Sequence, residues 1–315
     1  MWFLCLVAKV HNTGPIASDV HPEPCPFPPK QVVRTDDVCW VFGADGEVMV
    51  LDDTGTRIGG PARPFPMAVR NAVACAGGIM ATWMDHELRV ARLALLRGPS
   101  LHDGPSRADV RKGMLIEHPA GHAWSHALDA EPLSLGQGHG GALLSLWPNG
   151  LYFIDDNGEE QWRTSLPADE NDRRNQVVDL VRDGHGFVAT MRDGTRCMVT
   201  REGVLPLESE SVDYPLEAVF HGEGSRLLVT TDHTVHWVEG GHTLLMAKLS
   251  GPVGEAVWSV NREAWCIGGW RERVELTRNG HRRWPCDELD VALVPFGDGG
   301  LLCLDNRGSW KAFPK

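Results

Sequence analysis

Residues 176–203 read QVVDLVRDGHGFVATMRDGTRCMVTREG, and the pattern within this stretch decides the fold. Short apolar runs at Gln176–Val181 and Phe187–Thr190, and a third run around Cys197, are separated by turns that contain glycine. The turn at Asp193-Gly194 favours a hairpin, because both central residues of a type I′ turn need a positive φ angle. Short apolar runs joined by such turns predict consecutive antiparallel strands.

The same unit recurs along the chain. Comparable turns occur at Asp45-Gly46, Asp85-His86, Asn149-Gly150, Asp193-Gly194, Asp232-His233, Gly268-Gly269 and Asn306–Gly308. The intervals are 40 residues from 46 to 86, 44 from 150 to 194, and then 39, 36 and 39. Three or four strands in about 40 residues is the size of one β-propeller blade. The sequence therefore predicts an all-β fold with seven blades, whose first strands start near Gln31, Met67, Leu133, Gln176, Leu216, Glu255 and Leu289.

One interval is longer than the others. It covers 64 residues, from 86 to 150, and Gly, Pro, Ser and charged residues cluster between Arg97 and Gly121. A surface loop tolerates added length at a small entropic cost. We therefore expect residues 97–121 to be an insertion loop within the second blade.

Both termini are expected to belong to one propeller domain that covers residues 1–315. The apolar run Trp2–Val10 has no basic residue ahead of it and contains Lys9, so it does not fit a signal peptide. We expect residues 1–10 to form a strand that joins the last blade and closes the ring, which would remove an open sheet edge. Residues 11–30 are rich in proline and are expected to be a linker.

The repeat resembles, in a general way, the WD-repeat and quinoprotein-like repeat propellers. The stretch Asp155–Trp162, DDNGEEQW, is similar to the end of a quinoprotein repeat, and Arg278–Trp284 is similar to it without the leading Asp. No repeat carries the Gly-His and Trp-Asp pairs of WD repeats. The resemblance implies a seven-bladed β-propeller and indicates no particular subfamily.

Composition restricts the class of partner. The chain has 315 residues, 30 Lys and Arg against 42 Asp and Glu, and a formal net charge of −12, which argues against binding to nucleic acid. No apolar run is long enough to span a membrane. None of the eight cysteines forms a Cys-x-x-Cys pair, and several lie in apolar runs. This usage favours a reducing compartment, and we expect a cytoplasmic protein.

Acidic residues recur near the start of the first strand in five successive units. They are Glu131, Asp179, Glu217, Glu255 and Asp290, whereas the two earlier units have Lys30 and Arg70 at the corresponding places. First strands line the channel of a propeller, so we expect these acids to surround one mouth of it. The turn acids Asp193 and Asp232 are expected on the same face. The alternative is that acids at strand starts are simply solvated, and that Asp is a good turn former.

Three histidines form a weaker candidate site. His118, His122 and His126 are spaced four residues apart, which would place them on one face of a helix and could suit a metal ion. Pro119 and Gly121 disfavour a continuous helix there, so a solvated histidine loop is the other interpretation.

No recognisable catalytic motif is present, and the leading hypothesis is a non-enzymatic scaffold or adaptor without a cofactor. It would bind one or more protein partners through an acidic loop face at the channel mouth, as a monomer or as a subunit of a hetero-complex. The alternative is a propeller hydrolase or lactonase that holds a divalent cation at the mouth, where oxygen ligands would suit calcium. A third possibility is a glycan- or ligand-binding module that uses exposed Trp side chains.

Overall fold

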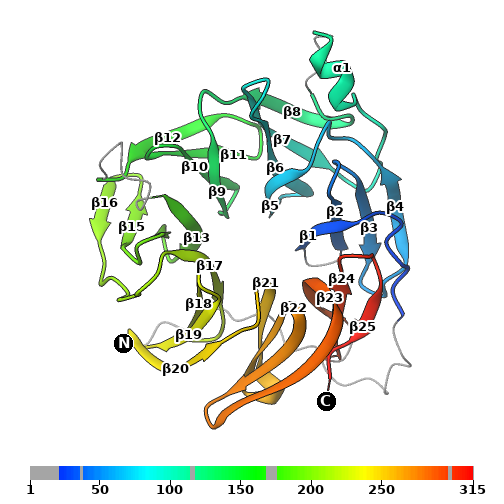
Figure 1. Cartoon of the computed structure of the whole chain (residues 1–315). Coiled ribbons are helices and arrows are strands. Elements are labelled where there is room, and N and C mark those ends of the chain that lie inside the picture. The colour runs from blue at the N-terminus through cyan, green and yellow to red at the C-terminus, as the bar shows by residue number, and fades with distance from the viewer. Residues whose placement is uncertain (1–20, 36–37, 114–117, 168–175, 297–299, 315) are drawn as a thin grey trace.

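The strands form a ring of antiparallel sheets around a central opening (Figure 1). The computed structural model describes residues 21–35, 38–113, 118–167, 176–296 and 300–314. Neighbouring first strands contact one another all the way around the opening. The expected all-β propeller is confirmed.

Five of the sheets have four strands each, in sequence order. The first contains β1 (Pro29–Arg34), β2 (Val38–Gly43), β3 (Val48–Asp52) and β4 (Arg57–Ala62). The second contains β5 (Val69–Cys75), β6 (Gly78–Asp85), β7 (Val90–Arg97) and β8 (His122–Ala127). The third contains β9 (Pro132–Gln137), β10 (Gly141–Leu146), β11 (Gly150–Asp155) and β12 (Glu160–Ser165). The fourth contains β13 (Val177–Asp183), β14 (Gly186–Met191), β15 (Arg196–Thr200) and β16 (Gly203–Pro206). The fifth contains β17 (Leu216–His221), β18 (Ser225–Thr230), β19 (Thr234–Glu239) and β20 (His242–Lys248).

The sixth sheet has five strands and corrects the expected number of blades from seven to six. It contains β21 (Val253–Ser259), β22 (Ala264–Thr277), β23 (Gly280–Phe296), β24 (Gly300–Asp305) and β25 (Trp310–Ala312), with a 3₁₀ helix at Val260–Arg262. The two units expected from Glu255 and from Leu289 are joined in it. The physical reason is that β22 continues past Gly268-Gly269 and Trp270 pairs with Leu289 on β23, so the hydrogen-bonded ladder passes from one unit into the next.

The expected closing strand at residues 1–10 lies outside the described residues. Of the expected linker, residues 21–28 form no strand, and β1 starts at Pro29. The Cys25 N–H donates to the carbonyl of Gly308 at 2.8 Å, and the Glu23 N–H donates to the carbonyl of Gly55 at 3.0 Å. This segment therefore connects the last turn of the sixth sheet with the outer turn of the first.

The segment between β7 and β8 contains a short helix, α1 (Arg107–Arg111), which projects from the ring (Figure 1). Ser106 caps it by accepting from the Asp109 N–H, while the Asp109 carboxylate accepts from the Ser106 N–H. Arg107 forms an ion pair with the buried Asp85 at 2.7 Å, and Arg111 contacts Glu87. The helix is thereby attached to the turn after β6.

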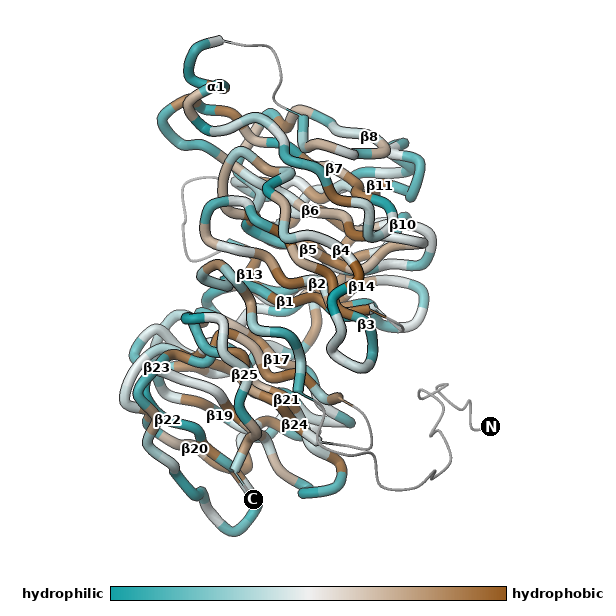
Figure 2. The backbone as a smooth tube through the Cα atoms, turned by 90° about the vertical axis from the view of Figure 1, so that its right-hand side faces the viewer, coloured by the Kyte–Doolittle hydropathy of each residue, from teal (hydrophilic) through white to brown (hydrophobic). Residues whose placement is uncertain are grey.

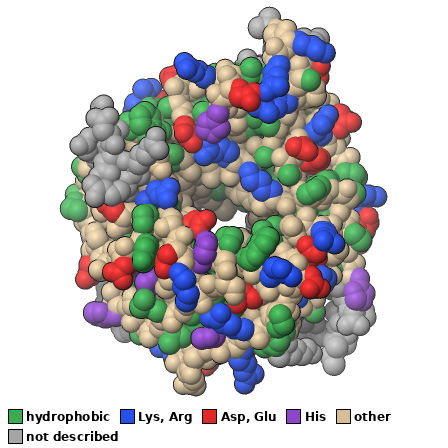
Figure 3. All heavy atoms as spheres, in the orientation of Figure 1, with side chains coloured by type: hydrophobic (Ala, Val, Ile, Leu, Met, Phe, Trp, Pro, Cys, Tyr) green, Lys and Arg blue, Asp and Glu red, His purple; other side chains and the backbone are tan. Residues whose placement is uncertain are grey.

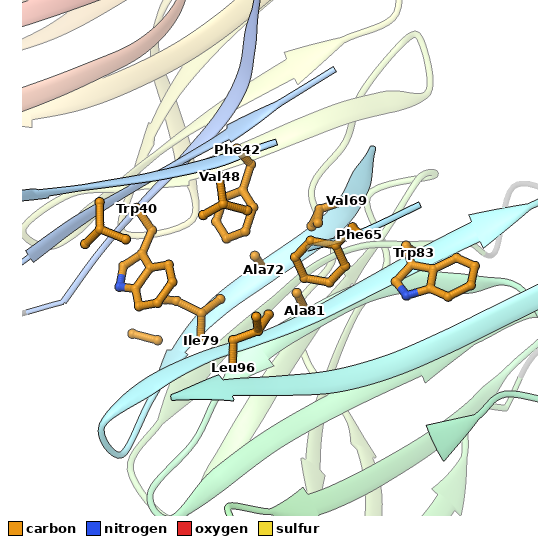
Figure 4. Packing of buried hydrophobic residues seen from close by; sticks show 12 residues of the cluster. Trp40, Phe42, Val48, Phe65, Val69, Ala72, Ile79, Ala81, Trp83 and Leu96 are labelled. Atoms are coloured by element: carbon orange, nitrogen blue, oxygen red, sulfur yellow. The ribbon is translucent and has the colours of Figure 1, made fainter. Parts of the chain in front are cut away.

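Apolar side chains fill the spaces between neighbouring sheets, because alternate residues of a strand point to opposite faces of its sheet. Figure 4 shows the cluster between the first two sheets, where Trp40, Phe42, Phe65 and Trp83 pack together with small residues of β5 and β6. Apolar residues gather along the strands, and polar residues gather at the turns (Figure 2). Among the strand Trp residues, Trp40, Trp237 and Trp265 are buried, whereas Trp147 is exposed.

Candidate functional site

One face of the ring consists of the segments before the first strands and the turns after the second strands. Backbone N–H groups of these segments donate to carbonyl oxygens just before or within the inner strand of the same sheet. The pairs are Ala44 with Pro28, Trp147 with Glu131, Arg192 with Gln176, Thr231 with Pro215, Trp270 with Pro252 and Asn306 with Leu289. We call this the mouth face, since the first strands border the opening that Figure 3 shows. Loops on such a rigid scaffold are common positions for binding residues.

A β-bulge interrupts every strand that borders the opening, close to the start of the strand except in β23, where it lies in the strand interior. The skipped residues, which have no partner on the adjacent strand, are Lys30, Arg70, Leu133, Val178, Glu217, Gly254 and Val291. Because a bulge redirects the side chains next to it, these positions define the structurally equivalent places around the mouth. They carry two bases, one acid, three apolar residues and one glycine, so the mouth is not an acidic ring.

The five acids predicted at the strand starts occupy four different levels relative to these bulges. Glu131 lies two residues before its bulge, Asp290 lies one residue before, and Glu217 is itself the bulged residue. Asp179 and Glu255 follow their bulges by one residue. Adjacent residues of a strand point to opposite faces, so carboxylates at different levels do not converge.

Four of the seven predicted acids have a basic partner. The pairs are Glu131 with Arg70 at 2.6 Å, Asp179 with His221 at 2.8 Å, Asp232 with Lys248 at 2.8 Å and Asp290 with Arg273 at 2.6 Å. The Lys248 ammonium and the hydroxyl groups of Thr230 and Thr234 lower the pKa of Asp232 far below its usual value. Asp290 is fully buried, which excludes it from any exposed mouth.

Of the remaining three acids, two are accessible. Glu217 is exposed on β17, and Asp193 is exposed in the turn after β14, where its carboxylate accepts from the Thr195 N–H at 2.9 Å. This geometry is that of an ordinary Asx turn. Within the described ranges, no group of three or more His, Cys, Asp or Glu side chains is arranged to hold a metal ion.

Glu255 has a different environment, because it is half-buried at the start of β21 and forms no ion pair with a basic side chain among the described residues. Burial raises its pKa to about 7, although the Ala256 N–H donates to the carboxylate at 3.2 Å and opposes this shift. The folded protein therefore holds this proton more tightly than the unfolded chain does. Stability that depends on this proton is complete at acidic pH and is lost as the pH rises toward 7 and above.

We expect Glu255→Gln to become progressively more stable than the wild type as the pH rises from about 4.5 to 8. The difference should reach at most about 3 kcal/mol, because Gln stays neutral where Glu must ionise in a buried place. Urea unfolding at a series of pH values measures it. Glu217→Gln, at an exposed position of the neighbouring sheet, is the matched control. Parallel stability curves for the wild type and Glu255→Gln would contradict the prediction.

The predicted histidines lie on a loop and a strand, not on a helix. The rings of His118 and His122 stack with their centroids 5.0 Å apart, and His122 Nδ1 lies 2.7 Å from the carbonyl oxygen of Pro119. His126, on β8, instead contacts the carbonyl oxygen of Gly158 in the third sheet. The structure thus brings together His118 and His122 and separates His126 from them. Both stacked rings border a pocket of about 600 Å³ within the insertion.

A larger cleft, of about 790 Å³, opens on the mouth face between the first two sheets and α1. Half-buried Met67, Ala68 and Met84 provide apolar surface within it. Four basic residues and three acidic residues also line it, namely Lys30, Arg63, Arg70, Arg107, Asp45, Asp85 and Glu87. Its lining is therefore slightly basic in a chain whose net charge is −12. Lys and Arg side chains are visible between the opening and the projecting helix (Figure 3).

Charges within this cleft are unequally compensated. Arg107 donates to the Asp85 carboxylate and holds its pKa at about 2, and it also contacts Glu87 at 3.3 Å. Burial and the neighbouring Arg70 guanidinium lower the pKa of Lys30. Within the part of the chain that the structure describes, the side chains of Lys30 and Arg63 form no ion pair with a carboxylate, although the Arg63 backbone N–H donates to Asp103 at 2.8 Å and the Arg63 charge helps to lower the pKa of Asp109. The cleft therefore offers two cationic groups beside an apolar wall.

Exposed aromatic side chains are a second feature of the mouth face. Trp147, Tyr214 and Trp270 are 43%, 53% and 46% exposed. Trp147 and Trp270 occupy equivalent turn positions, because each donates its backbone N–H to the residue before an inner strand. Tyr214 directly precedes Pro215 in such a segment. The sequence did not predict that these three aromatic residues lie on the mouth face. It did place Lys30 and Arg70 at corresponding positions of their units.

Comparison with known proteins shows the fold. No family model matches the chain, and no curated protein matches it. Among solved structures, the WD40 β-propeller domain of Doa1 superposes with a TM-score of 0.62 at 11% identity, over 94% of each chain. BamB from Moraxella catarrhalis gives 0.55 at 13% identity, over 89% of this chain and 81% of its own. The computationally designed Ika8 protein gives 0.58 at 15% identity, over 90% of this chain and 83% of its own.

These likenesses establish a β-propeller and carry no activity with them. Among the described residues, no helix has the length and apolar character that crossing a membrane requires.

Proposed function

We propose that this chain is a non-enzymatic interaction propeller that binds a protein partner on its mouth face. The observation that carries the proposal is that Trp147, Tyr214 and Trp270 are exposed on the same face as the cleft between the first two sheets. Large aromatic side chains are enriched among the residues that dominate binding energy at protein interfaces. A WD40 propeller domain, that of Doa1, is among the structures that this fold resembles.

The pairing of the mouth acids supports binding over cation-dependent catalysis. A calcium site needs several oxygen ligands directed at one point. Glu131 and Asp179 are each paired with a basic side chain, Asp290 is buried against Arg273, and Glu217 lies apart on its bulge. The seven described cysteines are free, which supports a reducing compartment such as the cytoplasm.

Replacing all three exposed aromatic residues by alanine should weaken partner binding at least about 30-fold, since one central aromatic contact can be worth about 2 kcal/mol. The measurement is quantitative co-purification from the native host, followed by a dissociation constant for the partner so identified. A matched control replaces Leu205, Leu244 and Met246, which are exposed on the outer strands β16 and β20. Loss of the partner in the control but not in the aromatic variant would refute the proposal.

A further inference from the structure

We infer that the cleft between the first two sheets and α1 binds an extended acidic segment of the partner, with apolar side chains between its carboxylates. This inference rests on the proposed function and names the chemistry of the partner at one part of the mouth face. It follows from the shape, charge and position of the cleft.

The cleft has rigid walls on both sides. On one side, α1 is attached through Arg107 to Asp85, whose carboxylate also accepts from the backbone N–H groups of Glu87 and Leu88. On the other side, Lys30 occupies the bulge of β1, and Arg70 occupies the equivalent bulge of β5. A site that is already formed loses little conformational entropy when its ligand binds.

The charges of the cleft select an anionic ligand. The Arg70 guanidinium donates to the Glu131 carboxylate at 2.6 Å, so its charge is largely satisfied. Lys30 and Arg63 are exposed cleft cations that form no ion pair with a carboxylate in the described ranges, and Asp45 is the cleft acid that likewise forms none there. A carboxylate that reaches Lys30 or Arg63 would gain a charge-assisted hydrogen bond there.

The apolar surface next to these cations favours a polypeptide segment as the ligand, because a segment can supply apolar side chains as well as carboxylates. Met67 and Met84 line the same cleft, and methionine adapts its shape to different apolar side chains. The volume alone would also suit a small anionic metabolite. A metabolite, however, would leave Trp147 and Trp270 on the same face unused, whereas a polypeptide can contact the cleft and the aromatic residues together.

The first test uses a fluorescein-labelled dodecapeptide in which glutamate alternates with leucine or methionine. We expect fluorescence anisotropy to show binding that weakens with added salt, and that weakens at least about tenfold in Lys30→Glu/Arg63→Glu. The matched control is Arg201→Glu/Arg282→Glu, which makes the same change of net charge at two exposed positions elsewhere and should bind within about twofold of the wild type. If the first variant does not fold, Lys30→Gln/Arg63→Gln replaces it.

Several results would overturn the inference. One is equal binding of the counterpart peptide with lysine in place of glutamate, and another is unchanged binding by the Lys30/Arg63 variant. A third is no binding of the acidic peptide up to about 1 mM at low salt. Complete competition by inorganic phosphate, together with equal binding when the apolar residues are replaced by serine, would identify a small-anion site instead.

A second test uses the partner complex itself. Acylation of lysine amines, read by mass spectrometry, should label Lys30 less in the complex than in the free propeller. Labelling is normalised to a reference peptide added after digestion, because Lys112 ends α1, Lys248 contacts Asp232 and Lys311 contacts Asp305, all close to the cleft or the mouth face. Unchanged labelling of Lys30 would refute the cleft as the contact, while loss of the partner in the aromatic variant would still support the mouth face. The two proposals can therefore fail separately.

Discussion

Asp290→Ala is expected to lower the free energy of unfolding by about 3–5 kcal/mol, because it leaves the buried Arg273 guanidinium without its counter-ion. Arg273 donates from Nε to Asp290 Oδ2 at 2.6 Å and from Nη2 to Oδ1 at 2.9 Å. It also donates from Nη1 to the carbonyl oxygen of Ala312 at 3.3 Å. The pair thus connects β22, β23 and β25, the strands through which the two expected units became one sheet.

Urea unfolding measures this loss, and a double variant provides the control. Arg273→Met/Asp290→Leu removes both charges and fills the space with apolar atoms, so it should be less destabilised than Asp290→Ala alone. If Asp290→Ala lowered the free energy of unfolding by less than about 1 kcal/mol, water would reach the Arg273 guanidinium, and the prediction would be contradicted.

Trp83→Ala is expected to cost a comparable amount, about 3–5 kcal/mol, through the cavity that it leaves between the first two sheets. Trp83 is fully buried on β6, in the cluster that Figure 4 shows, and it lies directly before Met84 and Asp85 of the cleft. Losing it should therefore also weaken binding at the cleft. Thermal and urea unfolding, together with the anisotropy assay, measure both effects.

Trp270→Ala is the matched control for Trp83, because the same side chain is removed from a place where it is 46% exposed. Its effect on stability should stay within about 0.5 kcal/mol, as is usual for surface substitutions. Trp83→Phe should cost clearly less than Trp83→Ala, since it keeps most of the apolar contacts and removes a buried Nε1–H for which the described residues supply no acceptor. Equal losses for Trp83→Ala and Trp270→Ala would contradict the burial on which the prediction depends.

Local sequence patterns were sufficient to predict the architecture. Strand periodicity and hairpin turns such as Asp193-Gly194 depend on neighbouring residues, and the spacing of these turns near 40 residues reports the repeat. The long interval from 86 to 150 predicted an insertion at residues 97–121, and α1 lies in that range. The sequence also showed that the first two units have the basic residues Lys30 and Arg70 near the start of the first strand, where the later units have acids.

The number of blades could not be obtained in this way. The turn at Gly268-Gly269 looks in the sequence like the other hairpin turns, yet β22 continues through it because Trp270 pairs with Leu289. That pairing is a contact between residues far from the local window on which a turn prediction rests. The burial of Asp290 against Arg273 could not be predicted either, because it also depends on a contact outside the local sequence window.

The sequence by itself determined a ring of short antiparallel strands and the residue types available at its mouth. Only the tertiary structure decided which of those residues face a ligand, because the partners of the acids are distant in the sequence and, for Glu131 and Asp179, come from a neighbouring sheet. Arg70 and Glu131 are 61 residues apart, and His221 and Asp179 are 42 residues apart. Each bulge also shifts the strand register by one residue, which changes the face to which a side chain points without changing the hydrophobic pattern that a sequence displays.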